Sequence, residues 1–484
     1  MLRICTESAP KWLVSKSASL VEIFRRINEN DSLDLALMSE FAELLSSAEL
    51  ELEVLDMCTK LLVFYLVKLQ GCVDAHYLTF AQKTIFLVFS YRNNPEIVCD
   101  FILKRMSRVC AAGHIGLNGP AVAEVFEDPE NLNLPFSQIP EDELHRYGSQ
   151  GLGTPGSQVS DAQLPSGAQS VLHLIFVAGQ VAVKFLFLAE KLEAQITSSL
   201  TRNGEDGQLE TAFGSTELEI EEARTALQKL VRDSLVEENS LKAVVPLLVE
   251  IASIALEAPR RARDPLVNAA SDCLAKFMLL SEEFCLRHLN LLLSALQKED
   301  FDPGLQTNLV IALGDLFHKH PNRISPYLQV LSKGLRSGSE QIRLTALTVL
   351  SHLILNDFFK PKGELADLSR LLCDLSPAVS QKAALFFGEL ASKDQDHLVM
   401  LLPELASGLA SDDAELELSG LNTIRILFDM IDDRKPAGPA LEPFIKKNPD
   451  AGYYILCRTS NKSGSDMQNI MKKGQSDSKI MILR

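Results

Sequence analysis

The stretch DPGLQTNLVIALGDL, residues 302–316, carries the pattern that decides the fold. Four leucines recur at i, i+4, i+8 and i+11, so they share one face of a helix. They are Leu305, Leu309, Leu313 and Leu316. Asp302 is a good N-cap residue, and Pro303 suits the first helical position because the N–H there has no intrahelical partner. The stretch therefore predicts an amphipathic helix that begins after Asp302 and buries one leucine stripe.

The same stripe recurs at an offset of 37 residues. The later copies are Ile342, Ala346, Leu350 and Leu353, then Val379, Ala383, Phe387 and Leu390, then Leu416, Gly420, Ile424 and Leu427. An earlier copy lies 39 residues upstream, at Leu266, Ala270, Leu274 and Phe277. Candidate N-caps precede the later copies at Ser339, Ser376 and Asp413, and Asp264-Pro265 repeats the device one residue out of register. A fixed period of this length is typical of helical repeat proteins.

A second apolar segment follows each stripe. These segments cover residues 288–296, 327–335, 365–375 and 399–409. Each unit thus reads as a helix, a turn and an antiparallel helix, which is the pattern of HEAT and armadillo repeats. One unit cannot bury its own stripe, so neighbouring units must stack. We expect an all-α, HEAT/armadillo-type α-solenoid of antiparallel helix pairs with disordered linkers.

Composition divides the chain into five regions. Residues 1–112 are expected to form N-terminal helical repeats, and residues 113–169 a disordered linker rich in acids, Gly, Pro and Ser. Residues 170–216 are expected to hold a long buried helix followed by a polar break. The solenoid would span 217–447, and 448–484 would be a polar, weakly basic tail.

The run VLHLIFVAGQVAVKFLFLA, residues 171–189, is long enough to cross a bilayer. However, His173, Gln180 and Lys184 lie inside it, and a lysine at the centre of a spanning helix costs about 3 kcal/mol. A helix buried on most sides within a large helical protein is the better interpretation.

Motifs for catalysis and cofactors are weak. GLGTPG, residues 151–156, matches GxGxxG, but no strand precedes it, no helix follows it, and Pro155 interrupts it. The nine cysteines include no CxxC pair, which indicates reduced, mostly buried thiols in an intracellular protein. We therefore expect no enzyme activity, no catalytic residue, no cofactor, no metal and no small-molecule substrate.

Basic residues near the predicted turns are candidates for DNA contact. A formal charge of −17 disfavours nucleic acid in general, so contact needs a local basic patch. The candidates are Arg260, Arg261 and Arg263 before the Asp264 helix, Lys333 and Arg336 before Ser339, and Lys360 and Lys362 on the opposite edge. For any one of them a solvated loop charge is the commoner role. Thr154, which precedes Pro155, is a candidate phosphorylation site.

Several segments resemble one family in order along the chain. They are residues 268–296, 308–322 and 344–374, with 173–193 and 235–251 upstream. Across about 170–432 the chain resembles the HEAT-repeat non-SMC subunit 1 family of condensin I, in a shortened form that lacks most of the long N-terminal helical region. The sister family of condensin II shares the Lys-Gly turn but matches residues 281–285 less well.

The resemblance implies a non-catalytic scaffold in mitotic chromosome condensation. It implies binding to a kleisin segment, proximity to the SMC ATPase pair and contact with DNA or chromatin, with no membrane contact. It implies a nuclear location, on chromosomes in mitosis and in the cytoplasm in interphase. The alternative from composition alone is a HEAT-repeat adaptor for nuclear transport or membrane traffic, because carriers use acidic concave surfaces for basic cargo.

Overall fold

The computed structural model describes residues 34–47, 52–91, 94–112, 166–205, 240–257, 265–297, 302–359, 361 and 364–393, with isolated positions between 218 and 229 and between 423 and 430. Within these ranges every regular element is a helix. The chain divides into two compact units, Met1–Ala295 and Leu296–Arg484. The expected all-α repeat fold is confirmed.

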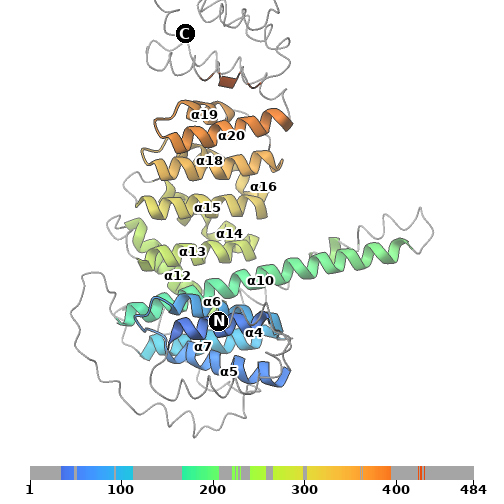
Figure 1. Cartoon of the computed structure of the whole chain (residues 1–484), viewed down its shortest axis with the longest axis vertical. Coiled ribbons are helices and arrows are strands. Elements are labelled where there is room, and N and C mark those ends of the chain that lie inside the picture. Colours follow the sequence, from blue (N-terminus) through green and yellow to red (C-terminus); the bar gives the residue numbers. More distant parts are fainter. Residues whose placement is uncertain are drawn as a thin grey trace, which may run out of the picture. The chain divides into compact units, whose positions relative to one another are not determined.

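Unit 1, Met1–Ala295, is built from eight described helices (Figure 1). They are α4 (Leu35–Ser47), α5 (Leu52–Lys68), α6 (Tyr77–Tyr91), α7 (Pro95–Ala112), α10 (Ser166–Glu205), α12 (Ser240–Glu257), α13 (Pro265–Leu280) and α14 (Glu282–Leu296). Helix α6 packs against α4, α5 and α10, and α10 also packs against α7 and α13. The long helix α10 is therefore the centre of this unit.

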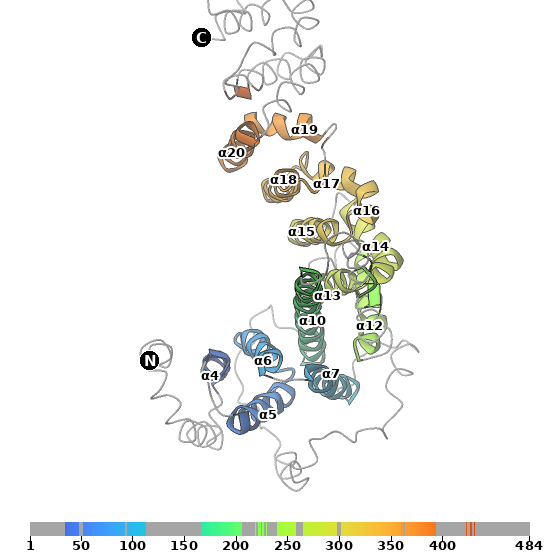
Figure 2. The ribbon, with the colours of Figure 1, turned by 90° about the vertical axis from the view of Figure 1, so that its right-hand side faces the viewer.

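Unit 2, Leu296–Arg484, shows the repeat in two layers (Figure 2). The first helices are α15 (Pro303–Lys319), α18 (Glu340–Leu355) and α20 (Pro377–Lys393). The second layer holds α16 (Pro321–Ile324), the 3₁₀ turn η3 (Ser325–Tyr327), α17 (Leu328–Gly334), α19 (Glu364–Arg370) and the 3₁₀ turn η4 (Leu371–Cys373). Helix α18 packs against both α15 and α20, so the first helices form one continuous layer.

Burial follows the 37-residue stripe closely. All twelve stripe positions on α15, α18 and α20 are at most 5 % exposed. On α13, Ala270, Leu274 and Phe277 are buried, while Leu266 is half-buried. Leu427 of the last copy is also buried, and Leu416, Gly420 and Ile424 lie outside the described residues. Each fully buried leucine or phenylalanine contributes about 1.5–3 kcal/mol, so the stripe is the main source of cohesion within unit 2.

The predicted N-cap residues Asp302, Ser339 and Ser376 directly precede α15, α18 and α20, and the side-chain cap hydrogen bond is described at Asp302. Asp302 accepts hydrogen bonds from the backbone N–H groups of Gly304 and Leu305, at 3.1 and 3.2 Å. Ser339 makes no side-chain cap hydrogen bond. Ser376 instead donates its hydroxyl to Glu340 Oε1 at 2.7 Å. The serine hydroxyl can donate as well as accept, and here a neighbouring carboxylate competes with the helix end. Asp413 and Asp264 lie outside the described residues.

The second helices of unit 2 are shorter than the sequence pattern predicts. Residues 327–335 become the end of η3 followed by the seven-residue α17, because Pro326 lacks the N–H that a continuous helix needs. Residues 365–375 become most of α19 followed by η4, where the last turn tightens to 3₁₀. Residues 399–409 lie outside the described residues. The apolar spacing locates this layer but does not give its helix lengths.

Helix α18 ends in a Schellman motif. Phe358 N–H donates to Leu353 O at 3.0 Å, and Asp357 N–H donates to Ile354 O at 3.1 Å. Asp357 has a φ of 59°, the left-handed conformation that usually takes glycine at this position. The turn is held to α15 because Phe358 packs on His318 and Phe359 packs on Phe317. This observation supports a structural role for the turn.

Helix α10 is buried over its first half only. Val171, Ile175 and Ala178 are fully buried or nearly so, and burial continues to Phe185. Phe187 is already exposed, and Figure 1 shows the rest of α10 extending past α6 and α7. The predicted burial on most sides is thus correct up to Phe185 and wrong beyond it. The helix also continues to Glu205, into the region predicted to be a polar break.

Residues 167–198 of α10 are also long and apolar enough to cross a membrane. This is weak evidence for a span, since a core helix of a soluble protein passes the same test and 56 % of the most apolar window is buried inside the protein. Packing against α6, α7 and α13 accounts for that burial.

Buried His173 joins α10 to the turn between α5 and α6. Its Nδ1 accepts the Gly71 N–H at 3.1 Å, and its ring stacks on Tyr77 with centroids 3.7 Å apart. Beside it, the Gln70 side chain donates to Met106 O and Ser170 O. The end of α7 and the start of α10 are therefore tied to the same turn.

Acid is expected to destabilise unit 1 through His173. Burial lowers its pKa from 6.5 to about 4. The unfolded chain then binds a proton more readily than the folded one, so the contribution is complete above pH 6.5 and is lost progressively as the pH falls from 6.5 to 4. The free energy of unfolding should fall by about 3 kcal/mol across this window. Urea unfolding at pH 7 and pH 4 measures it, and His173→Phe, which keeps the stack on Tyr77, should reduce the pH dependence. An unchanged pH dependence would contradict the assignment.

Candidate nucleic-acid interface

Two of the predicted DNA-contact residues lie together at the junction between repeats of unit 2. Lys333 is in the last turn of α17 and is exposed. Arg336 follows in the turn that leads to α18, and its backbone N–H donates to Lys333 O at 3.0 Å. The turn thus presents two cations within four residues on the edge between the layers.

Arg336 is engaged by a carboxylate from the next repeat. Its Nη2 lies 2.6 Å from Asp367 Oδ1, and its side chain is 64 % exposed. Arg370 Nη1 lies 3.4 Å from the same oxygen. Two arginines therefore share one aspartate, with Lys333 close by in the sequence. This edge keeps excess positive charge even though each arginine has a partner.

Arg370 was missed at the sequence level. It occupies the position of Lys333 shifted by 37 residues, at the end of the second helix of the next repeat. Applying the repeat offset to the basic residues, as well as to the apolar stripe, would have found it. The candidate interface is therefore Lys333, Arg336 and Arg370, which we call the basic edge.

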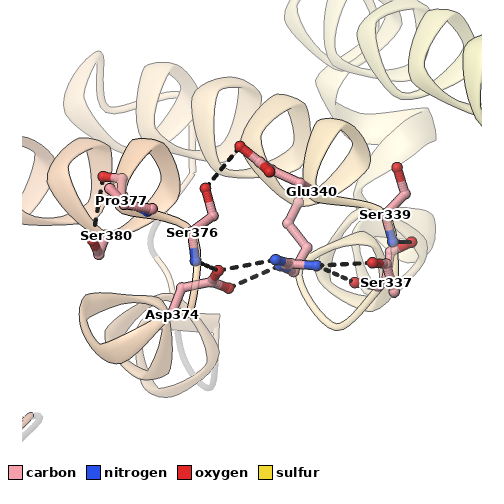
Figure 3. A network of polar contacts seen from close by, with 9 residues as sticks. Ser337, Ser339, Glu340, Asp374, Ser376, Pro377 and Ser380 are labelled. Carbon is pink, nitrogen blue, oxygen red and sulfur yellow. Dashed lines mark hydrogen bonds and ion pairs between the residues drawn. The ribbon is translucent and has the colours of Figure 1, made fainter.

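A largely buried ion pair lies next to the basic edge. Arg343 Nε and Nη2 donate to Asp374 Oδ2 and Oδ1 at 2.8 and 2.9 Å. Arg343 Nη1 also donates to Ser337 O at 2.9 Å, within the turn that carries Arg336. The two side chains are only 16 % and 9 % exposed. Figure 3 shows Asp374 facing this turn, with Ser376 directed at Glu340.

The charge of Asp374 is held by these contacts. Burial alone would raise the pKa of its carboxyl, but the hydrogen bonds from Arg343 and from the Ser376 N–H outweigh burial and lower the pKa. The pair is thus fully charged at neutral pH. Its contribution to stability is lost only as the pH falls below the ordinary aspartate range. Arg343 is consequently a structural residue that positions the turn, and it is not free to meet a phosphate.

The remaining predicted site residues lie outside the described residues. These are Arg260, Arg261, Arg263, Lys360, Lys362 and Thr154. In the part of the chain that the structure describes, no group of three or more His, Cys, Asp or Glu side chains could hold a metal ion. Burial raises the pKa of Cys58 and Cys110 to about 12, so these thiols remain protonated at neutral pH.

Comparison with known proteins shows which family the chain is similar to. Residues 305–438 match the family model described as non-SMC mitotic condensation complex subunit 1. The chain is 29 % identical over 358 residues to condensin complex subunit 1 of Xenopus laevis, covering 73 % of this chain and 24 % of that protein. It is 34 % identical over 240 residues to condensin complex subunit 1 of Schizosaccharomyces pombe, covering 46 % of this chain and 20 % of that protein. The chain is therefore similar to condensin complex subunit 1.

The condensin match includes the basic edge and its supporting ion pair, since the family model begins at Leu305. The chain spans about a quarter of the length of the curated condensin relatives that it matches. The crystal structure of the S. pombe condensin Cnd3-Cnd2 subcomplex aligns with a TM-score of 0.35 and 13 % identity, covering 100 % of this chain and 75 % of that one. A TM-score of this size supports no inference about function.

Proposed function

We propose that the chain is a non-catalytic scaffold subunit of the condensin complex. In this role it binds a segment of the kleisin subunit and adds a DNA contact during mitotic chromosome condensation, while the SMC pair hydrolyses ATP. The supporting observation is the coincidence of the 37-residue repeat series with the region that matches the non-SMC condensation subunit family. Stacked repeats offer an extended surface to a bound chain, which suits a scaffold.

The basic edge is the proposed DNA contact within the described residues. Lys333, Arg336 and Arg370 are exposed side chains on the edge between the layers of unit 2, where they can meet the phosphates of a duplex that runs along the repeats. Asp367 holds Arg336 and Arg370 in position. We extend the proposal to Arg260, Arg261 and Arg263, which precede the corresponding helix of another repeat in the sequence. Lys360 and Lys362, in the turn within one repeat and predicted on the opposite edge, are further candidates.

Charge reversal of the basic edge is expected to weaken DNA binding by the assembled complex. With Lys333, Arg336 and Arg370 all changed to glutamate, affinity should fall, and the slope of log K against log salt should flatten by about 0.9 for each phosphate that the edge no longer neutralises. Fluorescence anisotropy with a labelled duplex at several salt concentrations measures both. Lys382→Glu is the control for each single charge reversal of the basic edge, because Lys382 lies on α20 in the first-helix layer. An unchanged slope in the triple variant would identify the basic edge as ordinary surface charge.

The kleisin contact is tested by reconstitution. The chain, mixed with a purified kleisin subunit, should elute with it as one complex in size-exclusion chromatography. The nuclear or chromosomal location is tested by imaging a tagged chain through the cell cycle. It should concentrate on mitotic chromosomes, whereas an adaptor for transport or membrane traffic would remain off them.

A further inference from the structure

Unit 1 carries an exposed aromatic patch where α10 extends beyond α6. Phe86 of α6 is 44 % exposed, and Phe187 of α10 is 58 % exposed. The ammonium group of Lys184 lies near both rings, 4.2 Å from the centroid of the Phe86 ring and 5.9 Å from that of Phe187. We call Phe86, Lys184 and Phe187 the aromatic-lysine patch. Figure 1 shows α10 passing α6 and continuing away from the body of the unit.

Lys184 has no carboxylate partner in the described part of unit 1. The contrast is with Lys83 of α6, whose ammonium group pairs with Glu40 at 3.1 Å and with Glu43 at 2.7 Å. Burial lowers the pKa of Lys184, which means that its charge is partly removed from water without an anion to replace the lost hydration. A carboxylate from another molecule could pair with the Lys184 ammonium group and replace the hydration that it has lost.

The patch rests on a rigid support. Next to it, Phe89 of α6 and Phe185 of α10 pack edge to face with ring centroids 4.9 Å apart. Phe185 is 6 % exposed, so this contact belongs to the core. The two exposed rings are therefore carried by helices fixed to each other, and binding would cost little ordering of the backbone.

We propose that the aromatic-lysine patch docks a segment of a partner protein in which a carboxylate side chain adjoins an apolar side chain. The carboxylate pairs with Lys184, and the apolar side chain covers the rings of Phe86 and Phe187. Nucleic acid fits less well, because single-strand binding combines stacking with a groove of several cations, and here one lysine stands alone near the rings. The patch lies outside residues 305–438, so this inference goes beyond the proposed condensin scaffold function and does not rest on it.

A defined peptide tests the docking site on the full chain. The probe is a fluorescein-labelled 12-residue peptide that repeats Glu-Phe-Asp-Leu three times. Its charge-reversed form, with lysine in place of each acid, and a 12-nucleotide single strand serve as competing classes. We expect the acidic peptide to bind, and Lys184→Gln and Phe187→Ala each to weaken it by about 5- to 10-fold. Both variants should keep the circular dichroism melting curve of the parent, because Phe187 is exposed and Lys184 makes no ion pair with a described residue.

Lys191→Gln is the matched control. Lys191 lies two turns after Lys184 on α10 and is exposed, so the substitution removes the same charge from the same face away from the rings. It should leave affinity within about twofold. The proposal fails if Lys184→Gln binds as tightly as the parent, or if Lys191→Gln weakens binding equally. It also fails if the lysine peptide or the oligonucleotide binds as well as the acidic peptide. Binding that appears only after residues 113–165 are replaced by a Gly-Ser linker would instead identify the chain's own acidic segment as the occupant.

Discussion

Replacing Asp374 with asparagine is expected to lower the free energy of unfolding by about 3 kcal/mol. The substitution keeps the shape of the side chain but removes the charge that faces Arg343 through two hydrogen bonds. The Arg343 guanidinium group, 16 % exposed, would then be left without its carboxylate. Removing one partner of a buried pair costs about 3–5 kcal/mol, and the residual exposure of Arg343 places this case at the low end. Urea unfolding followed by helical circular dichroism measures the decrease.

The same junction between repeats provides a matched control. Arg336 and Asp367 are separated by 31 residues, as are Arg343 and Asp374, but Arg336 is 64 % exposed. Asp367→Asn should therefore cost less than about 1 kcal/mol. Arg343→Lys should destabilise nearly as much as Asp374→Asn, because an ammonium group cannot make the paired hydrogen bonds. Equal small effects for Asp374→Asn and Asp367→Asn would show that the Arg343 pair does not hold the repeats together.

Replacing Gly314 with alanine is expected to destabilise unit 2 by about 1–3 kcal/mol. A Cβ atom at Gly314 would lie 2.4 Å from Val349 Cγ1, so α15 and α18 approach too closely to admit a methyl group. Valine has one strongly preferred rotamer in a helix, which leaves it little room to turn aside. Overpacking of this kind usually costs about 1–3 kcal/mol. Thermal unfolding of the variant should show a lower midpoint.

Gly388 is the control for Gly314 because it occupies the same repeat position two copies later. A Cβ atom there meets nothing within 4 Å among the described residues, and Gly388 is exposed on α20. Gly388→Ala should stabilise the protein by up to about 1 kcal/mol, since alanine has the better helix propensity. If both alanine variants shift the unfolding midpoint in the same direction, the contact between Val349 and a Cβ atom at Gly314 does not determine the effect of the substitution.

The 37-residue stripe could be predicted from the sequence because it depends on burial, and burial requires a regular apolar spacing. Every stripe position on α15, α18 and α20 is buried as expected. The positions of the serine caps could also be predicted, but not the hydrogen bonds of their side chains, because a hydroxyl accepts or donates according to its neighbours. Ser376 meets Glu340 from the preceding repeat, and 36 residues separate the two in the sequence. The residue at which burial of α10 ends could not be predicted either, because it depends on how far the neighbouring helices extend along α10.

The location of the candidate site could be predicted from the sequence, but the ion pairs of its arginines could not. The repeat register places Lys333 and Arg336 at a junction between units, and the structure describes them there. The partners of the arginines come from the next repeat, which only the packing of helix pairs reveals. Only this packing shows that Arg336 is exposed and shares Asp367 with Arg370. It also shows that Arg343 is largely buried and positions the turn.

The most direct test of the proposed function is co-purification of the tagged chain from mitotic cells, read by mass spectrometry. We expect recovery of a kleisin and an SMC pair in comparable amounts, with the basic-edge variant recovering them equally because that edge is assigned to DNA. Recovery of transport factors or coat proteins without any SMC protein would contradict the assignment of this chain to condensin.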